Sequence, residues 1–378
     1  MSSGTAPLWV SLEESNGSSS VAINTLLAAM LGAHQQISDL IFSPGRVPQL
    51  QSRGELIPIQ APVIRPLTAD DTRRIASELI GANKQAISTL REHGSCDVSY
   101  GLPGVARFRV NVFIQRGSCV VVMRVIPTVV PSLTSLGLPP RLHEAARLRD
   151  GMVLVTGPRN SGKSSTLAAL LDDINEERVC HVITLEDPIE FLHNHKCATV
   201  HQRELHSDTP SFPLGLRAAM RQAPDVILVS ELQERDTVEM AIEAAETGHL
   251  VFSSLNAPDA TKAIERIVGF FSTPEQIGIR KRLARSLRCV ISQKLLPRKN
   301  GNGRIAVAEV LTMDAQKRKQ LEDNEYRELP AARTASWDDM DSGIAELVQA
   351  GVIDLDTALL HTNNPERLRF VLDTRPAK

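Results

Sequence analysis

The sequence predicts a mixed α/β protein, with a small α+β domain followed by a larger domain built on a doubly wound, largely parallel sheet. Residues 107–113 alternate polar and apolar positions, which is typical of a half-exposed strand, and residues 118–126 are expected to form its partner strand after a turn at Arg116-Gly117. From residue 151 onward, short β-branched runs alternate with helical stretches, as in parallel strands joined by helices. A segment with four prolines, residues 127–140, separates the two patterns and predicts a linker.

Local patterns predict the elements of the first part in order. Residues 1–20 are rich in Ser and Gly and are expected to be poorly ordered. Thr68 precedes two aspartates and is expected to cap a helix. The expected elements are a helix over 21–33, a strand over 37–42, a helix over 68–80, and strands over 107–113 and 118–126.

The second part is expected to contain strands over 152–156, 179–185, 226–229 and 250–253, with mostly helix beyond Pro330. The length of 378 residues agrees with about two to three domains. We therefore expect four segments: a poorly ordered start (1–20), the α+β domain (21–127), a linker (128–140) and the sheet domain with a helical C-terminal region (141–378).

Composition argues against several classes of protein. A net charge of -2 and an aromatic content of 3% disfavour nucleic-acid binding. The five cysteines include no CxxC pair, which argues against a disulfide framework or a cysteine zinc site. A group of histidines at 193, 195, 201 and 206 lacks a recognised metal-ligand spacing. No stretch is apolar enough for a membrane span, and the N-terminus does not resemble a signal peptide, so a cytoplasmic protein is expected.

A glycine-rich loop predicts a phosphate site. Residues 157–164, GPRNSGKS, follow an apolar strand, precede a helix and match the pattern GxxxxGK[ST]. Such a loop directs backbone amides at phosphate oxygens, its lysine reaches the β- and γ-phosphates, and its last hydroxyl ligates Mg²⁺. The residues expected to bind the nucleotide here are Gly157, Pro158, Asn160, Ser161, Gly162, Lys163, Ser164 and Ser165.

Carboxylates follow two other apolar strands. Glu231 ends the run DVILVSE, which predicts a buried strand delivering an acid to the ligand-binding edge of the sheet. After a phosphate loop, this acid is expected on the magnesium side, so Ser164 and Glu231 are the candidate metal ligands. The segment TLEDPIE at 184–190 brings further carboxylates to a strand end, where one can polarise the attacking water.

These motifs together resemble the PilT/PilU branch of secretion ATPases, the type IV pilus retraction motors. The resemblance extends from about Leu27 to Leu372 and rests on ordered motifs: GPRNSGKSSTLAAL, ITLEDPIEF, HQRE, LRAAMRQAPDVILVSE, AAETGHLVF and AELVQAGVI. It implies a PAS-like N-terminal domain, a RecA-like ATPase domain and a hexameric ring that uses ATP and Mg²⁺.

The resemblance also assigns roles to individual residues. Lys163 and Ser164 become the Walker A pair, Glu186 the glutamate that activates water, and Glu231 the Walker B acid. His249 matches the first histidine of the family's His box. Further catalytic candidates, expected to contact nucleotide across the ring, are Arg107, Arg109 and Arg124.

The chain departs from the family pattern at several positions. Arg159-Asn160 replaces Thr-Gly in the phosphate loop, and we expect Asn160 to adopt the left-handed backbone conformation that the loop requires. The second His-box histidine is replaced by Asn256, and Gln233 stands where the family has an arginine. Residues 313–320 replace the family's retraction signature.

The expected function is an ATP-hydrolysing hexameric motor that powers pilus retraction and twitching motility, with a PilU-like accessory role open. Its expected partners are a PilT homologue and an inner-membrane pilus platform protein, with peripheral attachment to the inner membrane. The alternative is a nucleotide-binding regulatory paralogue with weak or no ATPase activity. A secretion or assembly motor of the same superfamily is disfavoured because the cysteines lack the pattern of a tetracysteine zinc insertion.

Overall fold

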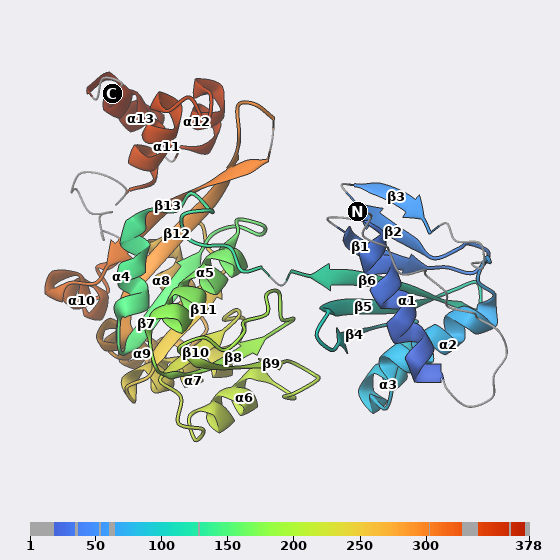
Figure 1. Cartoon of the computed structure of the whole chain (residues 1–378). Coiled ribbons are helices and arrows are strands. Elements are labelled where there is room, and N and C mark those ends of the chain that lie inside the picture. The colour runs from blue at the N-terminus through green and yellow to red at the C-terminus, as the bar shows by residue number, and fades with distance from the viewer. Residues whose placement is uncertain are drawn as a thin grey trace. The chain divides into compact units, whose positions relative to one another are not determined.

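The structure is a computed structural model that divides into two compact units, residues 1–128 and 129–378, each described here by itself (Figure 1). It describes residues 19–34, 37–52, 54–59, 65–127, 129–301, 303–326, 339–362 and 364–374. Most of the N-terminal stretch expected to be poorly ordered, residues 1–18, lies outside the described residues. Within the described residues, no helix is long and apolar enough to cross a membrane.

The first unit is an antiparallel sheet packed against helices. Its strands run in the order β3-β2-β1-β6-β5-β4, and every neighbouring pair is antiparallel. The strands are β1 (Ile37–Phe42), β2 (Gln49–Ser52), β3 (Glu55–Pro58), β4 (Ser95–Leu102), β5 (Ala106–Gln115) and β6 (Ser118–Ile126). The helices are α1 (Ser19–Ala33), α2 (Ala69–Ile80) and α3 (Lys84–His93).

Alternation along β5 separates the two faces of this sheet. Phe108 and Val110 are buried in the core that the three helices share with the sheet. Arg107 and Arg109 alternate with them and therefore lie on the other face. The polar–apolar pattern in the sequence thus marks a sheet whose helices, among the described residues of this unit, pack on the face opposite the arginines.

Thr68 caps α2, as the sequence predicts. Its hydroxyl accepts from the Asp71 amide at 3.1 Å, and the Asp71 carboxylate accepts from the Thr68 amide at 2.7 Å. This reciprocal pair satisfies amides that the first helical turn would leave without partners. Arg65 adds a 2.6 Å ion pair to the Asp71 carboxylate. Burial opposes the ionisation of Asp71, but the hydrogen bonds from Arg65 and Thr68 outweigh it and lower its pKa to about 2.

The second unit is a doubly wound sheet. Its strands run in the order β13-β12-β7-β11-β10-β8-β9, all parallel to their neighbours except β13. They are β7 (Gly151–Thr156), β8 (His181–Glu186), β9 (Thr199–Glu204), β10 (Val226–Val229), β11 (Leu250–Leu255), β12 (Leu287–Pro297) and β13 (Arg304–Thr312). Its helices before β12 are η1 (Pro140–Leu142), α4 (His143–Arg147), α5 (Lys163–Glu177), α6 (Phe212–Ala219), α7 (Arg235–Glu246), α8 (Ala260–Gly269) and α9 (Thr273–Ser286).

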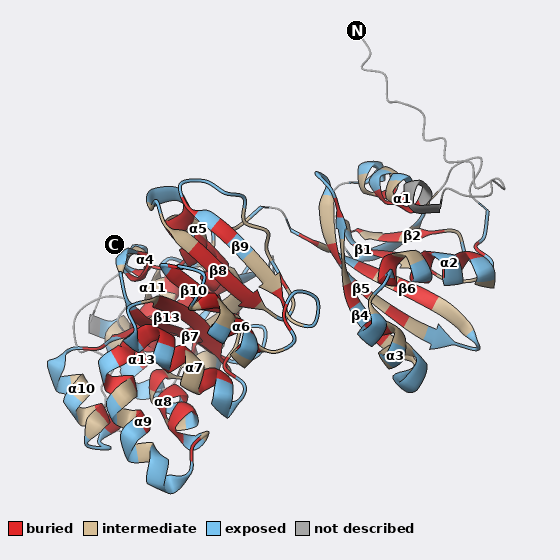
Figure 2. Cartoon of the chain, turned by 90° about the horizontal axis from the view of Figure 1, so that it is seen from below, coloured by how far each residue is buried: buried red, intermediate tan, exposed pale blue. Residues whose placement is uncertain are grey.

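Both faces of this sheet are buried (Figure 2). Met152 and Leu154 of β7 point into one core, which they share with α6 to α9. Val153 and Val155 point into the opposite core, which they share with α4 and α5. The continuous apolar runs in the sequence follow from this double burial.

The structure corrects two details of the sequence-based prediction. The strand expected from Val179 begins at His181, and Val179 itself is 94% exposed, because burial rather than β-propensity fixes where the strand starts. Part of the segment expected as a linker (128–140) packs onto the second unit, because Leu133 and Leu138 insert into the core beside α4. The proline-rich segment is therefore a packed part of the second unit.

The C-terminal part is helical, as expected. It comprises α10 (Ala315–Glu322), α11 (Met340–Gln349), α12 (Leu355–His361) and α13 (Pro365–Thr374). The last three helices pack on Leu296, Ile305 and Val307, at the outer end of the hairpin formed by β12 and β13 (Figure 1). A small α+β unit, a parallel-sheet unit and a helical C-terminal region together confirm the predicted fold class.

Candidate functional site

Polar residues from four strands meet at one edge of the parallel sheet. Gly157 follows β7, Glu186 ends β8, Glu231 lies two residues after β10, and Asn256 follows β11. Because these strands are parallel, their carboxyl ends share one edge. Ligands of open α/β sheets bind at this edge.

The backbone of the glycine-rich loop adopts unusual conformations at three positions. Gly157, Asn160 and Gly162 have φ angles of 153°, 61° and 88°. The left-handed conformation expected for Asn160 is confirmed, so this side chain fills a position that favours glycine. At Gly162 a Cβ atom would lie 2.9 Å from the Gln293 amide nitrogen, so no side chain fits there.

Gln293 of β12 joins the phosphate loop to helix α5 through two hydrogen bonds. Its amide nitrogen donates to the Ser161 carbonyl at 2.8 Å, and its amide oxygen accepts from the Thr166 hydroxyl at 2.6 Å. Gln293 is 1% exposed, so both bonds are shielded from water. Sequence analysis did not identify this residue, because β12 lies far along the chain and carries no recognisable motif.

Lys163 is positioned for an anion. It opens α5, whose N-cap is Gly162 and has no capping side chain, so the positive end of the helix dipole faces the loop. The Lys163 ammonium donates to the carbonyls of Gly157 and Pro158 at 3.1 and 2.9 Å and to the Asn256 amide oxygen at 2.8 Å. These are neutral acceptors. Burial lowers the pKa of Lys163, while Glu231 and Glu190 oppose that shift.

Glu186 lies beside a small cavity. Its carboxylate accepts from the Thr184 hydroxyl at 2.6 Å and from the Gln202 amide at 2.9 Å. Burial nevertheless raises the pKa of Glu186 above its ordinary value. The cavity, about 40 Å³ in volume, is also lined by Ser164, Glu190 and Ser230. That volume has room for about two or three water molecules, so a water can sit between Glu186 and the phosphate loop.

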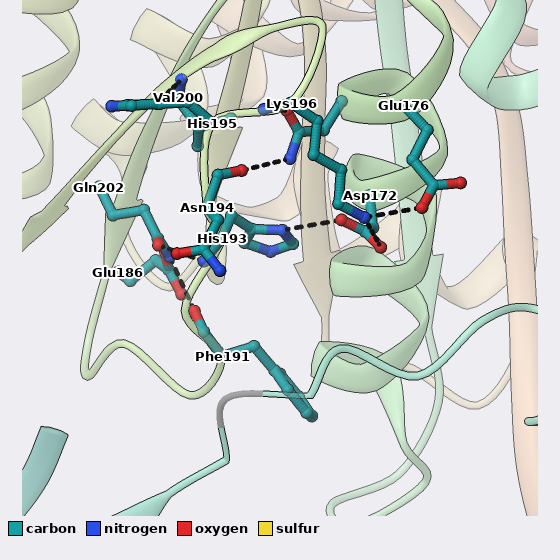
Figure 3. A network of polar contacts seen from close by, with 11 residues as sticks. Asp172, Glu176, Glu186, Phe191, His193, Asn194, His195, Lys196, Val200 and Gln202 are labelled. Atoms are coloured by element: carbon teal, nitrogen blue, oxygen red, sulfur yellow. Dashed lines mark hydrogen bonds and ion pairs between the residues drawn. The ribbon is translucent and has the colours of Figure 1, made fainter. Parts of the chain in front are cut away.

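The segment between β8 and β9 is fixed by side-chain hydrogen bonds to β9 and to α5 (Figure 3). Gln202 donates to Glu186 and to the Phe191 carbonyl, and it accepts from the His193 amide at 2.9 Å. On the other side, Lys196 donates to Asp172 and Glu176 of α5 at 2.9 and 2.7 Å. Gln202 belongs to the HQRE motif, but only the structure shows that it positions Glu186.

The histidines of this region make structural contacts. His193 faces Asp172 at 3.8 Å, and His195 accepts from the Val200 amide at 3.1 Å. The rings of His181 and His201 share a 2.9 Å hydrogen bond. No group of three or more metal-ligating side chains occurs among the residues that the structure describes.

The two candidate metal ligands have other partners in this structure. The Ser164 hydroxyl donates to Glu190 at 3.0 Å. Glu231 accepts from Gln233 at 3.0 Å and also from the Asn256 amide nitrogen. Glu190 and Asn256 therefore belong to the site as well. The sequence analysis named Glu190 only as one of several carboxylates in its segment, and Asn256 only as the replacement of a family histidine.

His249, which the family resemblance makes a catalytic candidate, lies away from this edge of the sheet within the second unit. It precedes β11, and its carbonyl accepts from the Gly151 amide at the opposite edge of the sheet. The length of β11, roughly 17 Å, separates it from the loop edge. Its ring bonds the Ala244 carbonyl at 2.9 Å, which ties the end of α7 to the strand.

The three candidate arginines lie on the first unit. Arg109 and Arg124 are direct cross-strand partners, and Arg124 is in turn opposite Asp39. Asp39 pairs with Arg124 at 3.1 Å, and Asp97 lies 3.7 Å from Arg109. Arg107 shares the face of Arg109. The acidic neighbours offset the repulsion that two arginines facing each other would otherwise cause.

Fold and site together define a P-loop ATPase with a RecA-like core. A model of the family described as Type II/IV secretion system protein matches residues 72–360, and the chain belongs to this family.

Two relatives and one solved structure extend this result. The Pseudomonas aeruginosa protein "Type IV pilus retractation ATPase PilT" is 37% identical over 348 residues, covering 91% of this chain and 99% of that one. "Type IV pilus ATPase PilU" of the same organism is 34% identical over 339 residues, covering 89% and 87%. A crystal structure of the pilus retraction motor PilT with bound ADP superposes with a TM-score of 0.81, at 36% identity over 92% of this chain and 99% of that one.

Proposed function

We propose that this chain hydrolyses ATP to power type IV pilus retraction, and with it twitching motility. The observation that carries the proposal is the combination of two features in one site. The phosphate loop carries Lys163 and has left-handed backbone conformations, and beside a small cavity the Glu186 carboxylate is positioned by a hydrogen bond from Gln202. The similarity to PilT over nearly its whole length supports retraction as the work performed.

Each residue of the site has a definite task in this proposal. The loop amides and Lys163 bind and orient the phosphates, and Glu186 accepts a proton from the attacking water. The Ser164 hydroxyl and Glu231 supply oxygen ligands that suit Mg²⁺, which would neutralise charge between the β- and γ-phosphates when bound. Gly157, Pro158 and residues 160–165 would thus bind the nucleotide, as the sequence motif predicts.

The acting species in this proposal is a homo-hexameric ring. Arg107, Arg109 and Arg124 of one subunit would contact the nucleotide of a neighbour and stabilise charge on the transferred phosphate. The ring would sit peripherally at the inner membrane and act on a pilus platform protein, as a main motor or beside a PilT homologue. We do not favour a purely regulatory paralogue, because Lys163, Glu186 and Glu231 are all retained.

Two variants test the proposal. Lys163→Ala removes the ammonium that binds phosphate and should abolish both phosphate release by the purified protein and twitching in a complemented deletion strain. Glu186→Gln should retain nucleotide binding and lose turnover, by about 10²-fold or more. A deletion strain that keeps its pili but does not twitch supports retraction. Loss of pili would point to assembly, and normal turnover in Lys163→Ala would refute the site.

A further inference from the structure

Asn256 occupies the space between the two oppositely charged residues of the site. It is the first residue after β11. Its backbone carbonyl accepts from the Arg266 guanidinium of α8 at 2.9 Å, which fixes the backbone at this point. The following residue, Ala257, is buried, so the turn carrying Asn256 is packed as well as hydrogen-bonded.

The Asn256 side chain bridges Lys163 and Glu231. Its amide oxygen accepts from the Lys163 ammonium at 2.8 Å, and its amide nitrogen donates to a Glu231 carboxylate oxygen. An ammonium can only donate hydrogen bonds and a carboxylate can only accept them. A residue between the two must therefore offer an acceptor to the ammonium and a donor to the carboxylate. A carboxamide carries both on a single planar group.

The bridge matters because Lys163 and Glu231 attract each other. Among the neighbouring charges, Glu231 contributes most to raising the pKa of Lys163, so the two groups attract each other across the Asn256 amide. In a partly buried site, removal of the intervening group would let the ammonium and the carboxylate approach and pair directly. A Lys163 held in such a pair would have to break it before binding phosphate.

We propose that Asn256 is a positioning residue that keeps Lys163 and Glu231 from pairing directly and so holds the phosphate loop ready for nucleotide. In this state the acceptors of Lys163 are neutral oxygens, which a phosphate displaces more easily than a carboxylate. The inference rests on the proposed function of the site as a nucleotide site, and it assigns Asn256 a role that acts through the two residues it separates.

The first test replaces Asn256 with alanine, which removes the carboxamide and leaves the space between the two charges open. Because the pairing it permits must be broken whenever a phosphate binds, Asn256→Ala should weaken binding of ADP and of a non-hydrolysable ATP analogue about tenfold. KM for ATP should rise by a similar factor while kcat changes less than about twofold, since uniform binding is lost. Calorimetric titration and steady-state phosphate release measure these quantities, and a melting curve establishes that the variant is folded.

The matched control is Gln233→Ala. Gln233 donates to the other oxygen of Glu231 and makes no hydrogen bond to Lys163, so its loss removes one hydrogen bond from the same carboxylate without removing the residue between the two charges. Binding should change less than about twofold. Equal effects of the two substitutions, or normal nucleotide affinity in Asn256→Ala, would overturn the proposal.

A second variant gives a readout that a purely structural role would not produce. In Asn256→His a neutral imidazole can accept from Lys163 and donate to Glu231, but an imidazolium has no acceptor. Nucleotide affinity in this variant should therefore match wild type near pH 8 and fall below about pH 6 relative to wild type. A pH profile of nucleotide affinity parallel to that of wild type would refute the proposal that residue 256 acts by separating Lys163 from Glu231. The binding arms also separate this inference from the proposed function, because ADP affinity can be measured even if turnover is absent.

Discussion

At the scale of single residues, the proposed catalysis by Glu186 would depend on a balance between burial and hydrogen bonding. Burial raises the pKa of this carboxyl, whereas Thr184 and Gln202 donate to the ionised form and partly offset the shift. Only the ionised form can accept a proton from water. The acid side of the pH–rate profile should therefore report the pKa of Glu186, above the ordinary value of a glutamate.

Removing one donor should move this profile in a predictable direction. Gln202→Leu destabilises the Glu186 carboxylate, so the pKa rises further and the acid limb of kcat should shift to higher pH by about one unit. Thr184→Val, which removes the other donor, should shift the limb the same way. Phosphate release measured from pH 5 to 9 checks both variants, and an unmoved acid limb would mean that Glu186 is not the base.

The residues of the phosphate loop and the carboxylates Glu186 and Glu231 could be selected as candidates from the sequence because each lies within a short continuous motif. Asn160 could be placed in the left-handed region because asparagine tolerates it. Gln293 and Asn256 could not be assigned their roles, since they meet Thr166 and Lys163 from strands 127 and 93 residues away. The position of His249 at the opposite edge of the sheet could not be predicted, because a motif specifies identity but not the edge on which a residue lies.

At the scale of elements, strands were predicted where burial on both faces makes the sequence continuously apolar. Val226–Val229 has the predicted bounds for this reason. The strands β9 and β12 were not predicted, because β9 is an edge strand with only two buried residues and the C-terminal end of β12 is mixed in polarity. Helix α2 was predicted from its cap, which is a local signal and therefore visible in the sequence.

The cap of α2 makes stability depend on pH. The folded pKa of Asp71, about 2, lies below its unfolded value of 3.8. Its contribution, about 1–2 kcal/mol, is therefore fully present above the unfolded pKa and is lost as pH falls toward 2. Asp71→Asn should lower the stability of α2 by this amount at pH 7, and the difference from wild type should shrink at pH 3.

Amide hydrogen exchange in α2 at the two pH values measures this effect. Asp70→Asn is the matched control, since it removes the same charge one residue earlier from a side chain that is 87% exposed. The Asp70 variant should remain within about 0.5 kcal/mol of wild type. Equal losses in both variants would indicate a general charge effect instead of the cap.

At the scale of the whole molecule, the phosphate loop and the candidate arginines belong to different units. The loop lies in residues 129–378, and Arg107, Arg109 and Arg124 lie in the first unit on the sheet face opposite the core that α1, α2 and α3 share with the sheet. In the proposed ring, the arginines of one subunit would complete the nucleotide site of its neighbour. Hydrolysis would then be coupled to motion between subunits, because the arginines would engage only at closed interfaces.

A mixing experiment distinguishes this arrangement from arginines that act within their own chain. Lys163→Ala and Arg109→Ala should each be inactive alone. When the two are co-assembled in equal amounts, about a quarter of the interfaces pair an intact loop with an intact Arg109, so ATPase activity should return to about a quarter of wild type. If Arg109 acts within its own chain, every subunit in the mixture carries a defect and no activity returns. The control is Arg91→Ala, which removes an arginine from helix α3 of the same unit. This variant should be active alone, because Arg91 does not lie on the sheet face that carries Arg107 and Arg109.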